Sequence, residues 1–207
     1  MWPLAAVIAF LTVALSGGIS QEYPKILNGT NGTSGFLPGG YTCRPHSQPW
    51  QAALLVQKRL LCGGVLVDPK WVLTAAHCLK EGYRVYLGKH ALGRVEAGDY
   101  PPTLQCANIQ LRSDEECHQV YPGKITPNML CAGTEEGGKD SCEGDSGGPL
   151  ICNGTLHGII SWGDFPCGQP NRPGVYTRVS QYVVWIRETI QKHRTQEWKR
   201  TKGKGPQ

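Results

Sequence analysis

The sequence lacks several features that assign a chain to common classes of protein. No apolar run is long enough for a transmembrane helix, no segment repeats, and there is no phosphate-binding loop, nucleotide fingerprint or nucleic-acid motif. The six histidines do not fall at ligand spacing with carboxylates or thiols, so no metal or other cofactor is expected. These absences point away from membrane proteins, nucleic-acid-binding proteins and cofactor-dependent enzymes.

Glycine and proline, in contrast, are abundant. The 207 residues include 27 Gly and 15 Pro, with 40% hydrophobic and 18% charged residues. A chain of this length can bury one substantial core or two small ones, and its hydrophobic fraction is too high for a disordered chain. So many turn-forming residues argue against a helical bundle and favour an all-β protein with short strands and tight turns.

The cysteines and the N-terminus both indicate secretion. Nine cysteines predict disulfides formed in an oxidising compartment, and because nine is odd, at least one has no partner within the chain. The apolar run Pro3–Leu15, followed by small residues, predicts a signal peptide over residues 1–18, although no Lys or Arg precedes it; a buried strand is the alternative. Sequons at Asn28, Asn31 and Asn153 are typical of a secreted, extracellular glycoprotein.

The remaining chain is patterned mainly as strands. Residues 21–40 read as an exposed approach segment rich in Gly, Asn, Thr and Pro. Asn153-Gly154 predicts a tight turn between two strands within 150–161. Short apolar runs bounded by Gly, Pro or Asp predict strands at 52–56, 60–67, 71–73, 85–87, 158–162 and 174–179.

One helix is expected, near the C-terminus. Ser180 is a suitable N-cap, and Tyr182, Val183, Ile186 and Ile190 share one face. Between Arg187 and Lys204 there are seven basic and two acidic residues. The basic tail, residues 192–207, either binds a polyanion such as heparin or is a solvated, frayed chain end.

Two short strings carry chemistry: Leu73-Thr74-Ala75-Ala76-His77-Cys78 and Asp140-Ser141-Cys142-Glu143-Gly144-Asp145-Ser146-Gly147-Gly148-Pro149. A serine hydroxyl is a poor nucleophile until a base takes its proton, and histidine suits that task near neutral pH. Glycines beside the serine let backbone N–H groups point at a reacting carbonyl oxygen. Alone, His77 reads as a packed or surface histidine and Ser146 as a turn serine. Together, the strings predict a catalytic serine.

From Tyr41 to about Gln191 the chain resembles the chymotrypsin/trypsin family of serine endopeptidases, and within it the tissue kallikrein group. The resemblance implies a double antiparallel β-barrel with a C-terminal helix. It also implies a propeptide over residues 19–25 and a peptidase domain over residues 26–191.

The resemblance implies a role for each motif residue. His77 is the general base, Ser146 the nucleophile, and the N–H groups of Gly144 and Ser146 form the oxyanion hole. Asp140 lies at the floor of a pocket that selects Arg or Lys before the scissile bond. The pocket and the substrate-pairing strand also include Ser141, Ser161, Trp162, Gly163 and Gly174. The implied partners are protein or peptide substrates with such residues and serine protease inhibitors.

The resemblance also implies an activation step and a disulfide pattern. Cleavage after Lys25 would free Ile26, whose ammonium would pair with Asp145, although the family's two glycines after the second residue are absent. The implied disulfides are Cys43–Cys106, Cys62–Cys78, Cys117–Cys131 and Cys142–Cys167. Cys152 remains unpaired, because its usual partner lies in a segment that this chain does not contain.

That missing segment falls near residues 98–100. His77 and Ser146 are 69 residues apart, about half the family's interval, and the absent stretch would carry several strands and the triad aspartate. Asp99 stands at the junction, between residues typical of turns, and Asp114 matches a surface loop. We therefore expect an incomplete double barrel, low stability and impaired catalysis.

Three hypotheses follow. The family favours a secreted endopeptidase that cleaves after Arg or Lys. The missing segment favours a catalytically inactive splice-type variant, either a decoy or a misfolded product. The basic tail alone favours a polyanion-binding module.

Overall fold

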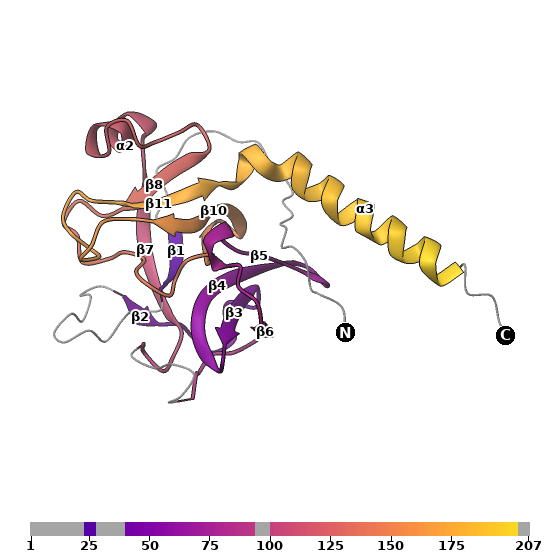
Figure 1. The fold of residues 1–207 in the computed structure, drawn as a ribbon. Coiled ribbons are helices and arrows are strands. Elements are labelled where there is room, and N and C mark those ends of the chain that lie inside the picture. The colour runs from indigo at the N-terminus through magenta and orange to yellow at the C-terminus, as the bar shows by residue number, and fades with distance from the viewer. Residues whose placement is uncertain (1–22, 28–39, 94–99, 203–207) are drawn as a thin grey trace.

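The computed structural model describes residues 23–27, 40–93 and 100–202 (Figure 1). The predicted signal peptide over 1–18 lies outside these residues, as do Asn28, Asn31 and Asp99. Among the described residues, no helix combines the length and apolar character needed to cross a bilayer. The strands are β1 (Tyr23–Leu27), β2 (Tyr41–Thr42), β3 (Gln51–Val56), β4 (Arg59–Asp68), β5 (Trp71–Leu73), β6 (Tyr83–Leu87), β7 (Gln105–Arg112), β8 (Met129–Gly133), β9 (Pro149–Cys152), β10 (Thr155–Trp162) and β11 (Gly174–Arg178). The helical segments are η1 (Ala76–Cys78), α2 (Asp114–Val120), η2 (Val179–Tyr182) and α3 (Val183–Lys202).

The first sheet is antiparallel, with the strand order β5-β4-β3-β6. Strands β3 and β4 form a hairpin whose turn residues Gln57 and Lys58 both have positive φ, as a tight hairpin turn requires. The sheet buries Ala52 and Leu54 against the Cys62–Cys78 disulfide. In the described part of the chain, β5 pairs only with β4 and β6 only with β3, so this sheet is open on both sides.

The second sheet runs in the order β1-β9-β10-β11-β8-β7-β2, and β1 also pairs with β7. The extra pairing joins β1, β9, β10, β11, β8 and β7 into a ring. Inside it pack Ile109, Leu130, Leu150, Ile160 and Tyr176, all buried. The ring provides one of the two cores that the chain length allows.

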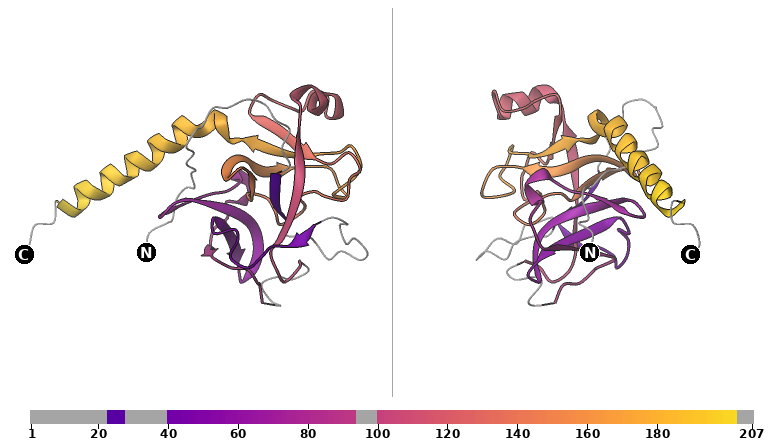
Figure 2. Two further views of the ribbon diagram at one scale, coloured as in Figure 1. Left: turned by 180° about the vertical axis from the view of Figure 1, so that it is seen from behind. Right: turned by 45° about the vertical axis from the view of Figure 1, so that its right-hand side comes forward.

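A third group of apolar side chains joins the two sheets to the C-terminal helix. Val65 and Trp71 come from the first sheet and Ile159 from the second, and they pack with Ile186 and Ile190 of α3. Figures 1 and 2 show α3 crossing the body at its first turns and then projecting away from it. The helix therefore holds the sheets together at one end only.

The expected architecture, a double antiparallel barrel with a C-terminal helix, is confirmed in the form of two curled antiparallel sheets. The predicted strands all appear, with ends shifted by a few residues, and Asn153-Gly154 forms the predicted turn between β9 and β10. The predicted incompleteness applies to the first sheet, whereas β1 closes the second.

Three local expectations were wrong. Residues 21–40 are not only an approach segment, because 23–27 form β1. Ser180 lies inside η2, and α3 begins at Val183 and continues as a helix to Lys202 rather than fraying after residue 191. A second helix, α2, was also missed.

Helix α2 begins with a capping box. Ser113 accepts a hydrogen bond from the Glu116 N–H, and the Glu116 carboxylate accepts one from the Ser113 N–H at 2.8 Å. The spacing Ser-x-x-Glu is a sequence signature of a helix start. This signal was present in the sequence and would have located α2.

We expect replacement of Ile190 by alanine to destabilise the protein. Ile190 is 0% exposed in the apolar group that joins α3 to both sheets, so Ile190→Ala should lower the free energy of unfolding by about 2–5 kcal/mol. Val184→Ala, on the same helix at a side chain 66% exposed, should change it by about 0.5 kcal/mol or less. Urea unfolding of both variants measures the difference; equal effects would contradict this packing.

Candidate active site

The two strings of the sequence meet where the first sheet touches the second. The Gly63 N–H of β4 donates a 2.9 Å hydrogen bond to the Ser146 carbonyl oxygen, and Cys78 Sγ lies 3.5 Å from the same oxygen. A Cβ atom on Gly147 would lie 2.1 Å from Thr74 Oγ1. Residues 74–78 are therefore packed against residues 146–147, although about seventy positions separate them in sequence.

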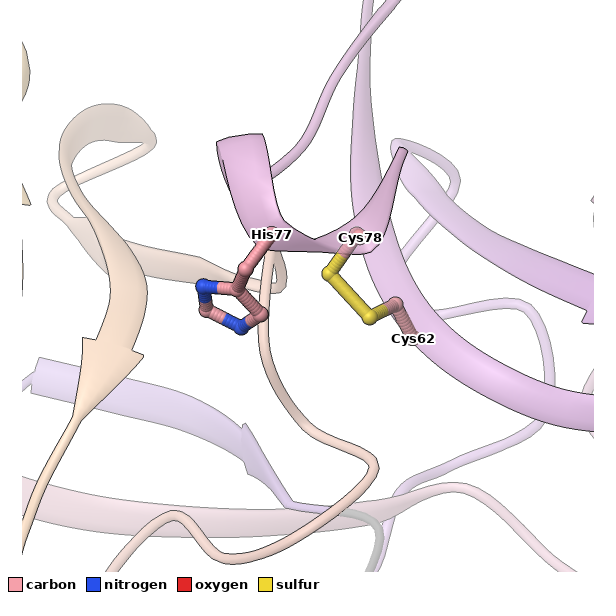
Figure 3. Close-up of side chains that lie close together, drawn as sticks. All are labelled: Cys62, His77 and Cys78. Atoms are coloured by element: carbon pink, nitrogen blue, oxygen red, sulfur yellow. A yellow bond between two sulfur atoms is a disulfide. The ribbon is translucent and has the colours of Figure 1, made fainter. Parts of the chain in front are cut away.

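His77 lies in η1 and is exposed. Its imidazole lies beside the Cys62–Cys78 disulfide (Figure 3), and one ring nitrogen and the two sulfur atoms fall within 4.8 Å of one another. The sulfurs are bonded to each other at 2.07 Å, so they are not available as thiolate ligands. The disulfide instead ties the turn that carries His77 to β4.

The predicted base and nucleophile share a neighbourhood but are not hydrogen-bonded. In the described part of the chain, His77 makes neither a hydrogen bond to Ser146 nor an ion pair with a carboxylate. A general base transfers a proton over a heavy-atom separation of about 2.6–3.2 Å. The imidazole must therefore move or rotate before it can take the Ser146 proton.

The backbone N–H groups around Ser146 differ in whether they have a hydrogen-bond acceptor. The N–H groups of Asp145, Gly147 and Gly148 donate to carbonyl oxygens within 3.1 Å. Those of Gly144 and Ser146 donate to no acceptor among the described residues. Gly144 has a φ of 89°, a conformation that favours glycine. The two unpaired donors are the pair that the resemblance assigns to the oxyanion.

Tyr100 is a site residue that the sequence did not reveal. A Cβ atom on Gly144 would lie 2.8 Å from Tyr100 Cζ, so the phenol ring packs directly on the Gly144 backbone. Tyr100 follows the junction at which the family segment is missing, and its side chain is half-buried. No local pattern marks it, because its contact with Gly144 arises only in the folded chain.

Asp140 is buried beside Gly174. The carboxylate is 3% exposed and accepts hydrogen bonds from the N–H groups of Ser141 at 2.7 Å and Gly168 at 3.1 Å. A Cβ atom on Gly174 would lie 2.8 Å from Asp140 Oδ1, and one on Gly163 would lie 3.7 Å from Gly174 Cα. Glycine at 174 thus leaves room beside a buried negative charge.

Tyr121 is a second residue that the sequence did not reveal, and it lies beside Trp162. Its ring packs edge-on against Trp162 at 5.1 Å, and its hydroxyl donates to the Pro173 carbonyl oxygen at 2.8 Å. Burial, together with the negative charge of Asp164, raises the pKa of Tyr121 to about 12. Ser161 and Trp162 end β10, which pairs with β11 and so lies beside Gly174.

The predicted activation pair consists of a buried carboxylate and a strand residue. Asp145 is 3% exposed and accepts a 2.8 Å hydrogen bond from the Cys142 N–H. Ile26 lies in β1, where its partner in register is Cys106 of β7. In this uncleaved chain the Ile26 nitrogen belongs to a peptide bond and carries no charge.

The structure brings together the four cysteine pairs that the resemblance implies: Cys43–Cys106, Cys62–Cys78, Cys117–Cys131 and Cys142–Cys167. Cys152, in β9, is buried and free. The Cys142–Cys167 bond ties the loop of the second string to the loop that donates the Gly168 N–H to Asp140.

Comparison with known proteins identifies the family. The family model described as Trypsin matches residues 37–100 and 91–186, which together span most of the chain. The chain belongs to the trypsin family of serine proteases. Human kallikrein-11 is 39% identical over 91% of this chain and 89% of its own length, and rat kallikrein-8 is 38% identical over 90% and 95%. These relatives place the chain in the tissue kallikrein group.

The solved structures agree with this membership. Neuropsin, a serine protease expressed in the limbic system of mouse brain, superposes with a TM-score of 0.68 at 38% identity, covering 73% of this chain and 98% of its own. The alignment with human kallikrein-11 spans 262 positions, more than the 207 residues of this chain, so that kallikrein has residues that this chain lacks. The two trypsin matches overlap over residues 91–100, and the predicted junction near 98–100 lies within this overlap.

We expect Gly147→Ala to destabilise the protein far more than Gly154→Ala. Both glycines have positive φ, so each substitution carries the same conformational cost of about 1–2 kcal/mol. At Gly147 the new Cβ would also strike Thr74 and the Gly63 carbonyl oxygen, whereas at Gly154 it meets nothing within 4 Å. Thermal unfolding compares the variants, and similar melting temperatures would show that the two strings are not in contact.

Proposed function

We propose that this member of the kallikrein group cleaves peptide bonds after Arg or Lys with low turnover. The observation that carries the proposal is the buried Asp140 carboxylate beside Gly174. A long cationic side chain is the complementary ligand for a narrow pocket that ends in a buried carboxylate. The pocket selects the substrate, and the reaction takes place at Ser146.

The reaction is acyl transfer. Ser146 Oγ attacks the carbonyl carbon on the carboxyl side of Arg or Lys while His77 accepts its proton. The N–H groups of Gly144 and Ser146 donate to the developing oxyanion. His77 then returns the proton to the leaving amine, and water hydrolyses the acyl-serine ester by the reverse path.

Low turnover follows from the surroundings of His77. In this family a buried aspartate holds the imidazole in the required tautomer, and replacing that aspartate with asparagine lowers kcat about 10⁴-fold. Within the described ranges no carboxylate pairs with His77. Binding and oxyanion stabilisation remain, so we expect slow catalysis rather than none.

The remaining assignments complete this proposal. The leader over residues 1–18 is removed on secretion, residues 19–25 are a propeptide, and the mature protein acts outside the cell. Serine protease inhibitors with a basic residue at the reactive bond occupy the Asp140 pocket. Within the group, we propose from its motifs that the chain is of the kallikrein-thirteen type. The alternative to a slow endopeptidase is a decoy, that is, a chain that binds such inhibitors but does not hydrolyse peptides.

Amide hydrolysis tests the catalytic proposal. The chain is secreted from eukaryotic cells, treated with a protease that cuts after Lys25, freed of that protease and assayed on an Arg-containing peptide amide. We expect turnover above a Ser146→Ala control but about 10³–10⁴-fold below an intact kallikrein, because no aspartate orients His77. Turnover equal to the intact enzyme would contradict the impairment.

Inhibitor binding separates the remaining outcomes. Asp140→Asn removes the carboxylate charge with little change of side-chain shape. The affinity for an arginine-directed inhibitor should therefore fall by about 100-fold or more. Turnover no higher than that of Ser146→Ala, with Asp140-dependent binding retained, would make the chain a decoy. A soluble protein that shows neither turnover above the Ser146→Ala control nor Asp140-dependent inhibitor binding would overturn the proposal.

A second candidate function concerns the extension of α3. Helix α3 continues to Lys202, and the sequence from residue 192 onward is rich in Lys and Arg. A cluster of basic residues in the sequence suits a polyanion. We propose that the basic tail gives the protein weak affinity for heparin in addition to its action on peptides.

Heparin chromatography tests this second function. Alanine at positions 192, 199 and 202 together should lower the salt concentration needed for elution, because each cation in contact with the polyanion releases counterions. The matched control replaces the exposed Lys58, Lys80 and Lys124 of the body and removes the same charge. Equal elution of the two triple variants would show that only net charge matters.

A further inference from the structure

Strand β1 of the second sheet comes from far outside residues 105–178, which supply β7 to β11 of that sheet. Strand β1 pairs antiparallel with β7 over its whole length, from Tyr23 opposite Ile109 to Leu27 opposite Gln105. It also pairs with β9, where Lys25 lies opposite Leu150. Figure 1 shows β1, in indigo, between strands from the second half of the chain. Nearly eighty residues lie between β1 and β7.

Strand β1 alone closes the ring. Among the described strands, the other neighbours of β7 are β8 and β2, and the other neighbour of β9 is β10. Without β1, the facing edges of β7 and β9 would have unpaired N–H and C=O groups beside the buried side chains of Ile109 and Leu150. Such an edge is a site for pairing with another strand.

We propose that residues 23–27 form a displaceable closing strand, which fills the slot between β7 and β9 in the uncleaved chain and must leave that slot before the chain can be cut after Lys25. The part concerning cleavage rests on the proposed activation step. The Lys25–Ile26 bond lies at the centre of β1, in a strand whose neighbours pair on both sides. A protease binds its substrate as an extended strand with a free edge, so β1 must leave the slot before it is cut. The Lys25–Ile26 bond therefore cannot be cut while β1 closes the ring.

The free cysteine provides a direct probe of the slot. Because β1 and β9 are antiparallel with Lys25 opposite Leu150, position 23 falls opposite Cys152. Opposite residues of an antiparallel pair have Cβ atoms about 4.5–5.5 Å apart, close to the span of a disulfide. Cys152 is free in the present chain, so it can accept a new partner without disturbing an existing bond.

The first experiment uses the full secreted chain carrying Tyr23→Cys. We expect a disulfide between position 23 and Cys152, detected by mass spectrometry of an unreduced digest. Pro24→Cys is the matched control, because neighbouring residues of a strand point to opposite faces, and it should leave Cys152 with a free thiol. Free thiols at both cysteines of the Tyr23→Cys variant, or bond formation in both variants alike, would overturn the proposal.

The second experiment needs no substitution. Trypsin should cut Lys25–Ile26 in the wild-type chain about tenfold or more slowly than in a free peptide of residues 21–30, because the strand must first leave the slot. The disulfide-bonded Tyr23→Cys chain should be cut more slowly than the Pro24→Cys chain, because its disulfide holds β1 in the slot. Equal rates for chain and peptide would overturn the closing strand. Neither readout requires turnover at Ser146, so failure of the proposed enzymatic activity would be seen separately.

Discussion

The hydrogen bond from the Gly63 N–H to the Ser146 carbonyl oxygen is the contact on which the site depends. It ties β4 of the first sheet to the loop before β9 of the second. The contact requires glycine: a Cβ atom on Gly63 would lie 3.1 Å from Gly148 Cα, and one on Gly147 would overlap Thr74. Ser146, the proposed nucleophile, is therefore held by backbone packing between the two sheets, near the Cys62–Cys78 disulfide.

The two sheets contribute unequally to what remains of the family's machinery. Asp140, Gly144, Gly163 and Gly174, which we assign to the proposed specificity pocket and oxyanion loop, all belong to the second sheet or its loops. That sheet is closed by β1, and its disulfides are in place. The first sheet supplies His77 but is open at β5 and β6, and its missing part would carry the aspartate. We therefore expect the proposed substrate binding to be better preserved than the orientation of His77.

Local sequence patterns predicted much of the fold. Apolar runs between Gly, Pro and Asp located six strands, and Asn153-Gly154 located a turn that needs positive φ. The Ser113-x-x-Glu116 box marked α2 and was overlooked. Strand β1 could not have been found in this way, because Tyr23–Leu27 is short and becomes a strand only through its pairing with β7 and β9.

The predicted chemistry can be read directly from the sequence: a serine and a histidine in family strings, a carboxylate six residues before the serine, and an odd number of cysteines. These depend on residue type and short spacing, which folding does not alter. Only the tertiary structure decided that His77 is exposed without a carboxylate partner among the described residues, that Tyr100 rests on Gly144, and that β1 closes the second sheet. Each of these is a contact between distant segments, and its free energy depends on the whole packing rather than on any local pattern.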